Sequence, residues 1–169
     1  MPAKKSEAEI RAGLPALMPR LWRYGLVLSG DPAQAQDLAQ ATALRALERA
    51  AQFAPDTRLD RWCFSILVSI WKNDLRARKT RIGNGEVVVE EAGLIDNSPA
   101  VEVNILANRV LSLTNQLPEG QRMAIFLVYV EGHSYAEAAA QMEIPIGTVM
   151  SRLANGRKRL KQAMGEDGT

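Results

Sequence analysis

The sequence of 169 residues contains one cysteine, Cys63, and one histidine, His133. A single cysteine excludes a disulfide within the chain, and one histidine beside it supplies too few ligands for a zinc site built from these residue types. We therefore expect Cys63 to be a buried small hydrophobic residue. Neither a metal nor a cofactor is expected.

Long hydrophobic runs are also missing. No window reaches eighteen apolar residues, so we expect no insertion into a membrane. The first ten residues, MPAKKSEAEI, carry charges without an apolar segment behind them, which does not fit a signal peptide. We expect a cytoplasmic location.

A catalytic constellation is lacking as well. His133 and Ser134 would form half of a hydrolase pair, but the sequence indicates no third group. A histidine in a loop is usually exposed, and we expect this for His133. The chain is not expected to be an enzyme.

Residues that favour helices dominate what is present: Ala, Leu, Arg, Glu and Gln. Valine clusters are few and short, which argues against a sheet. Apolar residues recur at helical spacing from about residue 7 to 28, from 32 to 51 and from 58 to 79. Further helical periodicity resumes at residue 101.

The motif SGDP at residues 29–32 predicts where the first helix ends and the second begins. Gly30 suits the left-handed position after a helix, Asp31 suits an N-cap, and Pro32 suits a first helical turn. On the second helix we expect four residues to face the core: Leu38, Ala41, Leu44 and Leu47.

The pattern predicts an all-α fold of two small helical domains joined by a flexible acidic linker. Glycines and the sequence DNSP interrupt the periodicity between the two helical parts. We place the domains at residues 1–82 and 100–169 and the linker at residues 83–99. The C-terminal domain is expected to contain a helix-turn-helix.

Charge is distributed unevenly although the net charge is only +2. Residues 72–81 carry five basic side chains against one acid, and residues 147–162 carry five and no acid. Residues 86–102 hold five acids and neither Lys nor Arg. Two basic patches separated by an acidic segment indicate that a polyanion is held at two places.

The C-terminal basic patch has the spacing of a helix-turn-helix: a short helix, the turn EIPI and a second helix from Gly147. An apolar back on that helix is expected at Val149, Leu153, Gly156 and Leu160. Arg and Asn on the front can pair with base edges, and Lys and Ser can reach phosphates. The candidate contacts are Thr148, Ser151, Arg152, Asn155, Lys158 and Arg159, with Arg152 and Asn155 first for bases. The alternative is a solvated amphipathic helix, which the preceding helix and tight turn make less attractive.

The third helix joins aromatic residues to cations. Trp62, Phe64 and Trp71 precede the basic residues, and aromatic rings can stack on unpaired bases while cations hold phosphates. For any single ring, a place in the core is the better interpretation. The second helix carries Asp37 and Gln40 one turn apart, which by residue type alone is an ordinary solvent face.

Two long segments resemble a known family. GDPAQAQDLAQATALRALERAAQFAPDTRLDRWCFSIL resembles region 2 of the extracytoplasmic-function (ECF) sigma factors. LPEGQRMAIFLVYVEGHSYAEAAAQMEIPIGTVMSRLANGRKRL resembles their region 4, with Leu117-Pro118, Glu131-Gly132, Ser134-Tyr135 and PIGTVMSRL in family order. The resemblance implies a dissociable promoter-specificity subunit of bacterial RNA polymerase.

The resemblance also implies site residues. The face that would bind the clamp helices of the largest subunit of the RNA polymerase core enzyme comprises Asp37, Leu38, Gln40 and Thr42. The residues that would capture a flipped base and melt the −10 element are Phe53, Arg58, Trp62, Ser69, Lys72, Asn73 and Arg76. The helix from Thr148 to Arg159 would read the −35 element of promoter DNA. An anti-sigma factor is the expected regulatory partner.

The chain departs from the family pattern in its third helix. Val68-Ser69 stands where members commonly carry Arg-Asn, and Asn73 stands where an Asp is usual. These departures predict an unusual preferred −10 sequence. Two alternative functions are a stand-alone helix-turn-helix transcription regulator and a sigma mimic that sequesters an anti-sigma factor.

Overall fold

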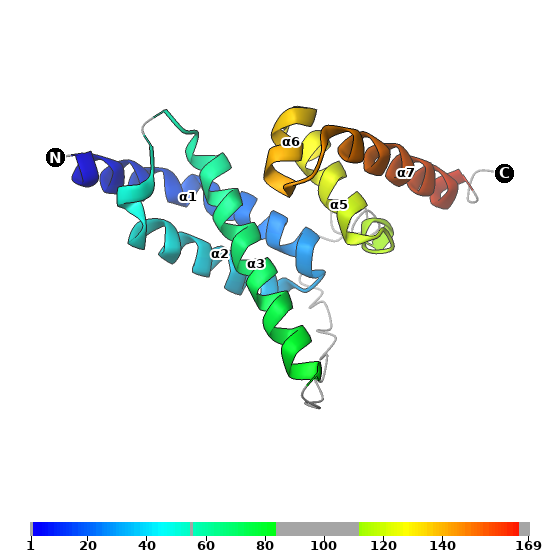
Figure 1. The fold of residues 1–169 in the computed structure, drawn as a ribbon, viewed down its shortest axis with the longest axis horizontal. Helices are drawn as coiled ribbons and strands as arrows, with labels where there is room; N and C mark the ends of the chain where they lie inside the picture. Colours follow the sequence, from blue (N-terminus) through cyan, green and yellow to red (C-terminus); the bar gives the residue numbers. More distant parts are fainter. Residues whose placement is uncertain (1, 55, 84–111, 166–169) are drawn as a thin grey trace, which may run out of the picture. The chain divides into compact units, whose positions relative to one another are not determined.

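The structure is a computed structural model that describes residues 2–54, 56–83 and 112–165 (Figure 1). The chain divides into two compact units, Met1–Leu94 and Ile95–Thr169. Every regular element among the described residues is helical, which confirms the predicted fold class. The predicted linker after Gly83 and the helix start expected near residue 101 lie outside the described residues. None of the described helices is both long enough and apolar enough to cross a membrane.

The N-terminal unit consists of three long helices and one short 3-10 helix. These are α1 (Pro2–Ser29), α2 (Pro32–Glu48), the 3-10 helix Ala50–Gln52 and α3 (Leu59–Gly83). Helices α1 and α2 lie side by side, and α3 crosses and contacts both of them (Figure 1). Helix α1 begins earlier than its periodicity predicts and contains two exposed prolines, Pro15 and Pro19. Its core side chains keep it continuous: Ile10, Leu14, Leu17, Leu21 and Tyr24.

The junction of α1 and α2 confirms the prediction made from SGDP. Gly30 has a φ of 70°, and the Asp31 carboxylate accepts a hydrogen bond of 3.0 Å from the backbone N–H of Ala33. Gly25 lets the two helices approach closely, since a Cβ there would lie 3.0 Å from the Cα of Ala35. A larger residue at position 25 would therefore push α1 and α2 apart.

The buried face of α2 differs from the predicted one. It is formed by Ala35, Leu38, Ala39, Thr42 and Ala46, which recur at helical spacing. The prediction was wrong for Ala41 and Leu44, which are exposed, with 60% of Leu44 accessible to solvent. Both lie off this stripe, because at 3.6 residues per turn Leu44 falls on the opposite side of α2 and Ala41 about 120° from the centre of the stripe.

Helix α3 supplies the centre of the N-terminal core. Phe64 is fully buried and meets the Tyr24 ring edge to face, with 5.2 Å between ring centroids. Cys63 is also fully buried, as predicted, and burial followed by the nearby charge of Asp60 raises the pKa of its thiol to about 12. The thiol therefore stays protonated at neutral pH and packs as a hydrophobic residue.

The described part of the C-terminal unit begins with a helix end at residues 112–115, followed by α5 (Glu119–Ile125) and a π-helical turn, Phe126–Val130. Helices α6 (Tyr135–Met142) and α7 (Ile146–Gly165) complete it. Helix α7 contacts both α5 and α6 (Figure 1). The core of the C-terminal unit includes Leu127, Val149 and Leu153, and each of these residues has at most 1% of its surface exposed.

The two ends of α6 show how the helix-turn-helix is built. Ser134 and Glu137 form a reciprocal capping box at its start. Glu143 ends it in the left-handed region, with a φ of 55°. Next to the cap, His133 is buried, so its expected exposure was wrong; its backbone N–H donates to the carbonyl of Leu127, which draws the loop onto the core.

Candidate nucleic-acid and protein interfaces

The front of α7 is polar and basic, as predicted. Val149, Leu153 and Gly156 are buried against the rest of the unit, and Leu160 is half-buried. Ser151, Asn155, Lys158 and Arg159 are exposed, whereas Thr148 and Arg152 are half-buried. Within the described residues, Lys158 and Arg159 form no ion pair, so both cations are available to a polyanion.

Part of this front borders α5. Asn155, Lys158, Arg159 and Gln162 line a hollow of about 340 Å³ together with Gln121 of α5. All of these side chains are polar, and two of them are cationic. The hollow is therefore suited to a phosphate group, which such side chains bind through hydrogen bonds and charge.

Arg152 lies against α5 as well. A Cβ placed on Gly120 would stand 2.7 Å from Nη1 and 2.8 Å from Cζ of Arg152. The guanidinium thus occupies space that only glycine leaves open. Gly120 and Gln121 were not predicted as neighbours of α7, because nothing in the local sequence marks a residue on α5 as a neighbour of one on α7.

On the other side of α7, Arg157 donates a hydrogen bond to the hydroxyl of Tyr129, from the π-helical turn. This bond and the neighbouring Tyr135 raise the pKa of Arg157 above its already high value. Arg157 thereby links α7 to the turn before α6. Its role was not predicted, since the tyrosine lies 28 residues away in sequence.

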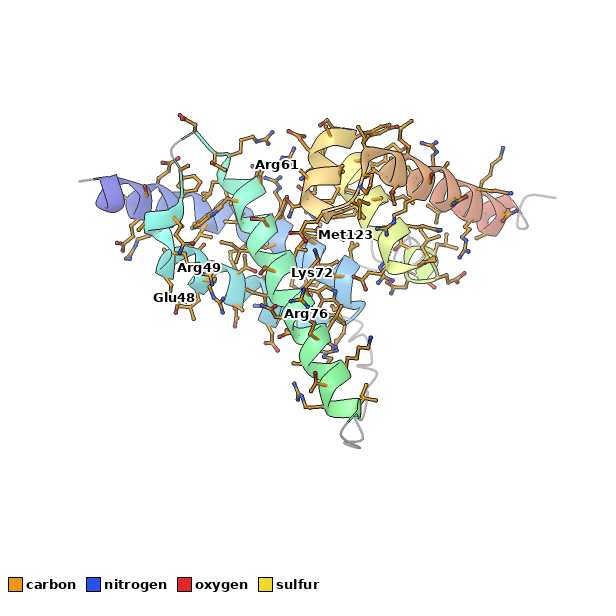
Figure 2. All side chains as sticks on the ribbon, viewed as in Figure 1. Glu48, Arg49, Arg61, Lys72, Arg76 and Met123 are labelled. Atoms are coloured by element: carbon orange, nitrogen blue, oxygen red, sulfur yellow. The ribbon has the colours of Figure 1, made fainter. Side chains whose placement is uncertain are left out.

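A second polar stripe runs along α3. Trp62, Ser69, Lys72, Asn73 and Arg76 recur at helical spacing on one side of the helix. Ser69, Asn73 and Arg76 are exposed, and Trp62 and Lys72 are half-buried. Figure 2 shows Lys72 and Arg76 one turn apart on α3. The structure therefore brings five of the predicted −10 residues to one helix face.

The aromatic residues of α3 separate into two groups. Phe64 and Trp71 are buried, and Arg78 covers the Trp71 ring at 5.7 Å while donating a 2.6 Å hydrogen bond to Gln34 of α2. Trp62 remains half-exposed next to Phe53, with 5.1 Å between ring centroids. Of the rings on α3, Trp62 is thus the one placed to meet a base.

The loop that precedes α3 is held at both ends. Phe53 is only 3% exposed and cannot present its ring to solvent in this conformation. At the other end, Arg58 donates to the carboxylate of Asp60 at 2.8 and 3.2 Å. Arg20 of α1 donates to the same carboxylate at 3.0 Å, and its guanidinium lies 5.2 Å from the Phe64 ring.

Asp60 is the centre of this cluster and was not predicted. Burial opposes ionisation of its carboxyl, but hydrogen bonds from Arg20, Arg58 and the backbone N–H of Arg61, with the charge of Arg58, lower its pKa below the usual value. Asp60 is therefore ionised at neutral pH. It ties the loop to α1 across 40 residues of sequence.

The predicted polymerase-binding face of α2 is only partly exposed. Asp37 and Gln40 face solvent, but Leu38 and Thr42 are 4% and 0% exposed, and the Thr42 hydroxyl donates to the carbonyl of Leu38. Both side chains belong to the core of the unit in this structure, and their contact with the polymerase stays a prediction. Leu44, predicted to be buried, lies on the exposed side of α2.

The residues that depart from the family pattern have different surroundings. Val68 is buried with 4% exposure, whereas Ser69 and Asn73 lie on the exposed stripe of α3. Only Ser69 and Asn73 can therefore change what this face contacts. Over the described residues, no cluster of three or more His, Cys, Asp or Glu side chains is arranged to hold a metal ion.

The described residues are helical, with a helix-turn-helix in one unit and a basic helix face in the other, which is typical of DNA-binding transcription proteins. Residues 15–81 match the family model of Sigma-70 region 2, and residues 107–160 match that of Sigma-70, region 4. The chain is 31% identical to the ECF RNA polymerase sigma factor EcfG of Rhodopseudomonas palustris, covering 94% of this chain and 87% of that one.

Two further proteins agree with this result. The ECF sigma factor SigL of Mycobacterium tuberculosis is 33% identical over 88% of this chain and 84% of its own length. The solved structure of the sigma factor RpoE in complex with the anti-sigma factor NepR, from Bartonella quintana, is similar to this chain. Its TM-score is 0.73 and its identity 27%, and the similarity covers 93% of this chain and 97% of that one.

The chain belongs to the ECF family of RNA polymerase sigma factors. It is a regulatory factor that directs promoter-specific transcription.

Proposed function

We propose that the two units read different parts of a promoter. The N-terminal unit binds the −10 element along the exposed stripe of α3, and the C-terminal unit reads the −35 element with the front of α7. The observation that carries this division is that, within the described residues, each unit has an exposed helix face that combines cations with other polar side chains and no acid: Lys72 and Arg76 on α3, Lys158 and Arg159 on α7.

On the N-terminal unit, Trp62 stacks on a base of the melted −10 element, and Ser69, Lys72, Asn73 and Arg76 follow the strand along α3. The loop at residues 53–58 borders this site. Phe53 supports Trp62 from within the core, and Arg58 both fixes the loop through Asp60 and keeps a side chain that is 63% exposed for the phosphate backbone.

On the C-terminal unit, α7 enters the major groove with its polar front. Asn155 and Arg152 contact base edges, and Lys158 and Arg159 hold phosphates. Thr148 lies in the first turn of α7, where the dipole favours anions, and Ser151 follows it at the next turn. The hollow beside Gln121 receives a phosphate of the same strand.

Helix α2 binds the polymerase core. Its exposed side carries Asp37 and Gln40, with Ala41 and Leu44 adding apolar surface. Leu38 and Thr42 support this face from inside the unit.

Regulation by an anti-sigma factor follows from the family relationship. The related RpoE has been solved in complex with the anti-sigma factor NepR, and we propose that this chain is likewise held inactive by such a protein. It acts in the cytoplasm beside the polymerase and has no catalytic activity of its own.

The test is promoter-dependent transcription with purified core polymerase. Asp37→Ala is expected to weaken core binding with little effect on −35 recognition, whereas Asn155→Ala weakens initiation at promoters that need the −35 element and leaves core binding intact. Glu7→Ala is the matched control, because Glu7 is an exposed carboxylate paired with Arg11 one turn away.

Equal losses in both assays from either substitution would contradict the division of labour. Tight, specific binding of duplex DNA by the free chain, with no association with core polymerase, would favour a stand-alone regulator. Association with an anti-sigma factor without any transcription would favour a sigma mimic.

A further inference from the structure

Arg152 is positioned by a feature of a neighbouring helix. Its guanidinium lies over Gly120, the second residue of α5, at a distance that leaves no room for a Cβ. Within the described residues, Arg152 takes part in no ion pair. The N-terminal end of α5 is also the positive end of its dipole, which does not attract a cation. The position of the guanidinium is therefore set by the space that Gly120 leaves open, and not by attraction to an opposite charge.

The Arg152 guanidinium lies at the edge of the polar front of α7. Asn155 follows Arg152 by three residues on the same side of α7, and Gln121 follows Gly120 on α5. Asn155 and Gln121 line the same hollow. Gly120 therefore borders the surface that faces DNA and restricts the directions from which Arg152 reaches it.

We propose that Gly120 is a specificity-determining positioning residue for the −35 element. By leaving the edge of α5 open, it lets the Arg152 side chain lie flat along that edge, so the guanidinium approaches the bases from the α5 side of α7. A side chain at position 120 removes this path and changes which base edge Arg152 can reach. This inference rests on the proposed −35 role of α7.

Gly120→Ala separates this role from a structural one. The new Cβ meets the far end of a flexible side chain, so Arg152 moves and the backbone does not. Alanine also favours a helix more than glycine does. The variant is therefore expected to unfold at the same denaturant concentration as the natural chain or a higher one, while its base preference changes.

The experiment uses the full chain bound to core polymerase and selects promoters from a library randomised across the −35 region. Five proteins are compared: the natural chain, Gly120→Ala, Arg152→Ala, the double variant and a control variant. Both single variants are expected to lose about fivefold or more of the preference at one and the same base pair, as expected when one side chain no longer pairs with its base. The double variant is expected to lose no more than Arg152→Ala alone.

A Gly120→Ala profile identical to that of the natural chain, beside an altered Arg152→Ala profile, would overturn the role of Gly120 and leave the proposed function standing. A changed profile in Gly120→Ala that Arg152→Ala does not share would also overturn it, since the effect would then not pass through the arginine. If the natural chain selects no −35 sequence at all, the proposed function itself fails. Gly165→Ala is the control, because a Cβ there meets nothing within 4 Å.

Discussion

The two units differ in whether the cations near their exposed helix faces are bound to other side chains of the protein. In the N-terminal unit, cations near α3 are engaged in contacts within the protein: Arg58 and Arg20 bind Asp60, and Arg78 binds Gln34 and covers Trp71. In the C-terminal unit, Lys158 and Arg159 project from α7 without an ion pair in the described residues.

This difference in how the cations are held fits the two proposed tasks, binding a melted strand and binding a duplex. A melted strand must be held in a shaped site that offsets the cost of unstacking bases, so the loop and the aromatic rings beside α3 need a rigid support. A duplex is approached from outside, and unpaired cations on a helix front supply attraction over several ångströms of water. The N-terminal face thus depends on internal order, and the C-terminal face depends on available charge.

The largest expected effect comes from removing the centre of the N-terminal cluster. Asp60→Ala leaves Arg20 and Arg58 without their shared carboxylate, whose side chain is 9% exposed. We expect the free energy of unfolding of the N-terminal unit to fall by about 2 kcal/mol, less than for a fully buried pair because Arg58 is largely solvated. Chemical denaturation followed by tryptophan fluorescence measures this, since Trp22, Trp62 and Trp71 all lie in that unit.

Glu48→Ala is the matched control for Asp60→Ala. Glu48 pairs with Arg45 at 3.8 Å, and the two side chains are 58% and 41% exposed. Its removal is expected to change the free energy of unfolding by less than about 0.5 kcal/mol. A decrease as large as that of Asp60→Ala would show that charge in general, and not the buried cluster, stabilises the unit.

The corresponding test in the C-terminal unit concerns packing. Helices α5 and α7 meet closely at Gly156, where a Cβ would lie 2.6 Å from Cδ1 of Ile125. Gly156→Val is expected to lower the free energy of unfolding of this unit by about 1–2 kcal/mol, because the larger side chain forces the helices apart. Circular dichroism during denaturation, with Gly165→Val as a control at a position without neighbours within 4 Å, checks this. An unchanged free energy would mean that Ile125 moves aside without cost.

The sequence predicted local features of the fold well, but it did not predict features that depend on contacts between distant elements. The caps at Asp31 and Ser134 and the buried back of α7 follow from residue type and spacing, which act within a few residues. The packed side of α2 did not follow, because several faces of an alanine-rich helix are apolar enough to bury. Packing against α1 and α3 buries Thr42 and leaves Leu44 exposed.

The candidate site residues were also predictable only from local spacing. Helical spacing correctly placed the predicted residues of α3 on one face of that helix and those of α7 on one face of the other. The roles of Asp60 and Gly120 could not be predicted, since each acts on a residue from another element: Arg20 lies 40 positions from Asp60, and the space beside Gly120 depends on how α5 crosses α7. Neither residue type indicates the role, as an aspartate in a first helical turn and a glycine near a helix start are both common.

The Asp60 cluster also predicts a pH dependence confined to the N-terminal unit. Its pKa is lower in the folded protein than the ordinary value of 3.8, so the folded state holds the proton less tightly than the unfolded chain. The stabilisation is full above about pH 5 and is lost as the pH falls below 3.8 towards the lower folded pKa. The difference in unfolding free energy between the natural chain and Asp60→Asn is therefore expected to shrink as the pH falls from about 5 to about 3.

Other carboxylates contribute equally to both proteins in that comparison and cancel. A difference that stays constant across this range would mean that Asp60 stabilises the loop by shape and hydrogen bonds rather than by its charge.

The smallest expected effect distinguishes the available cations of α7 from the engaged ones near α3. When a protein binds one phosphate fewer, the slope of log K against log salt concentration falls by about 1. Lys158→Gln and Arg159→Gln are each expected to lower this slope by about that amount for −35 duplex DNA bound by the polymerase complex. Arg58→Gln is expected to lower the slope for −10 DNA by clearly less, because Asp60 already neutralises much of the Arg58 charge. Equal changes from all three substitutions would mean that Arg58 leaves Asp60 for a phosphate when DNA binds, and the contrast between an ordered N-terminal face and a charged C-terminal one would then hold only for the free protein.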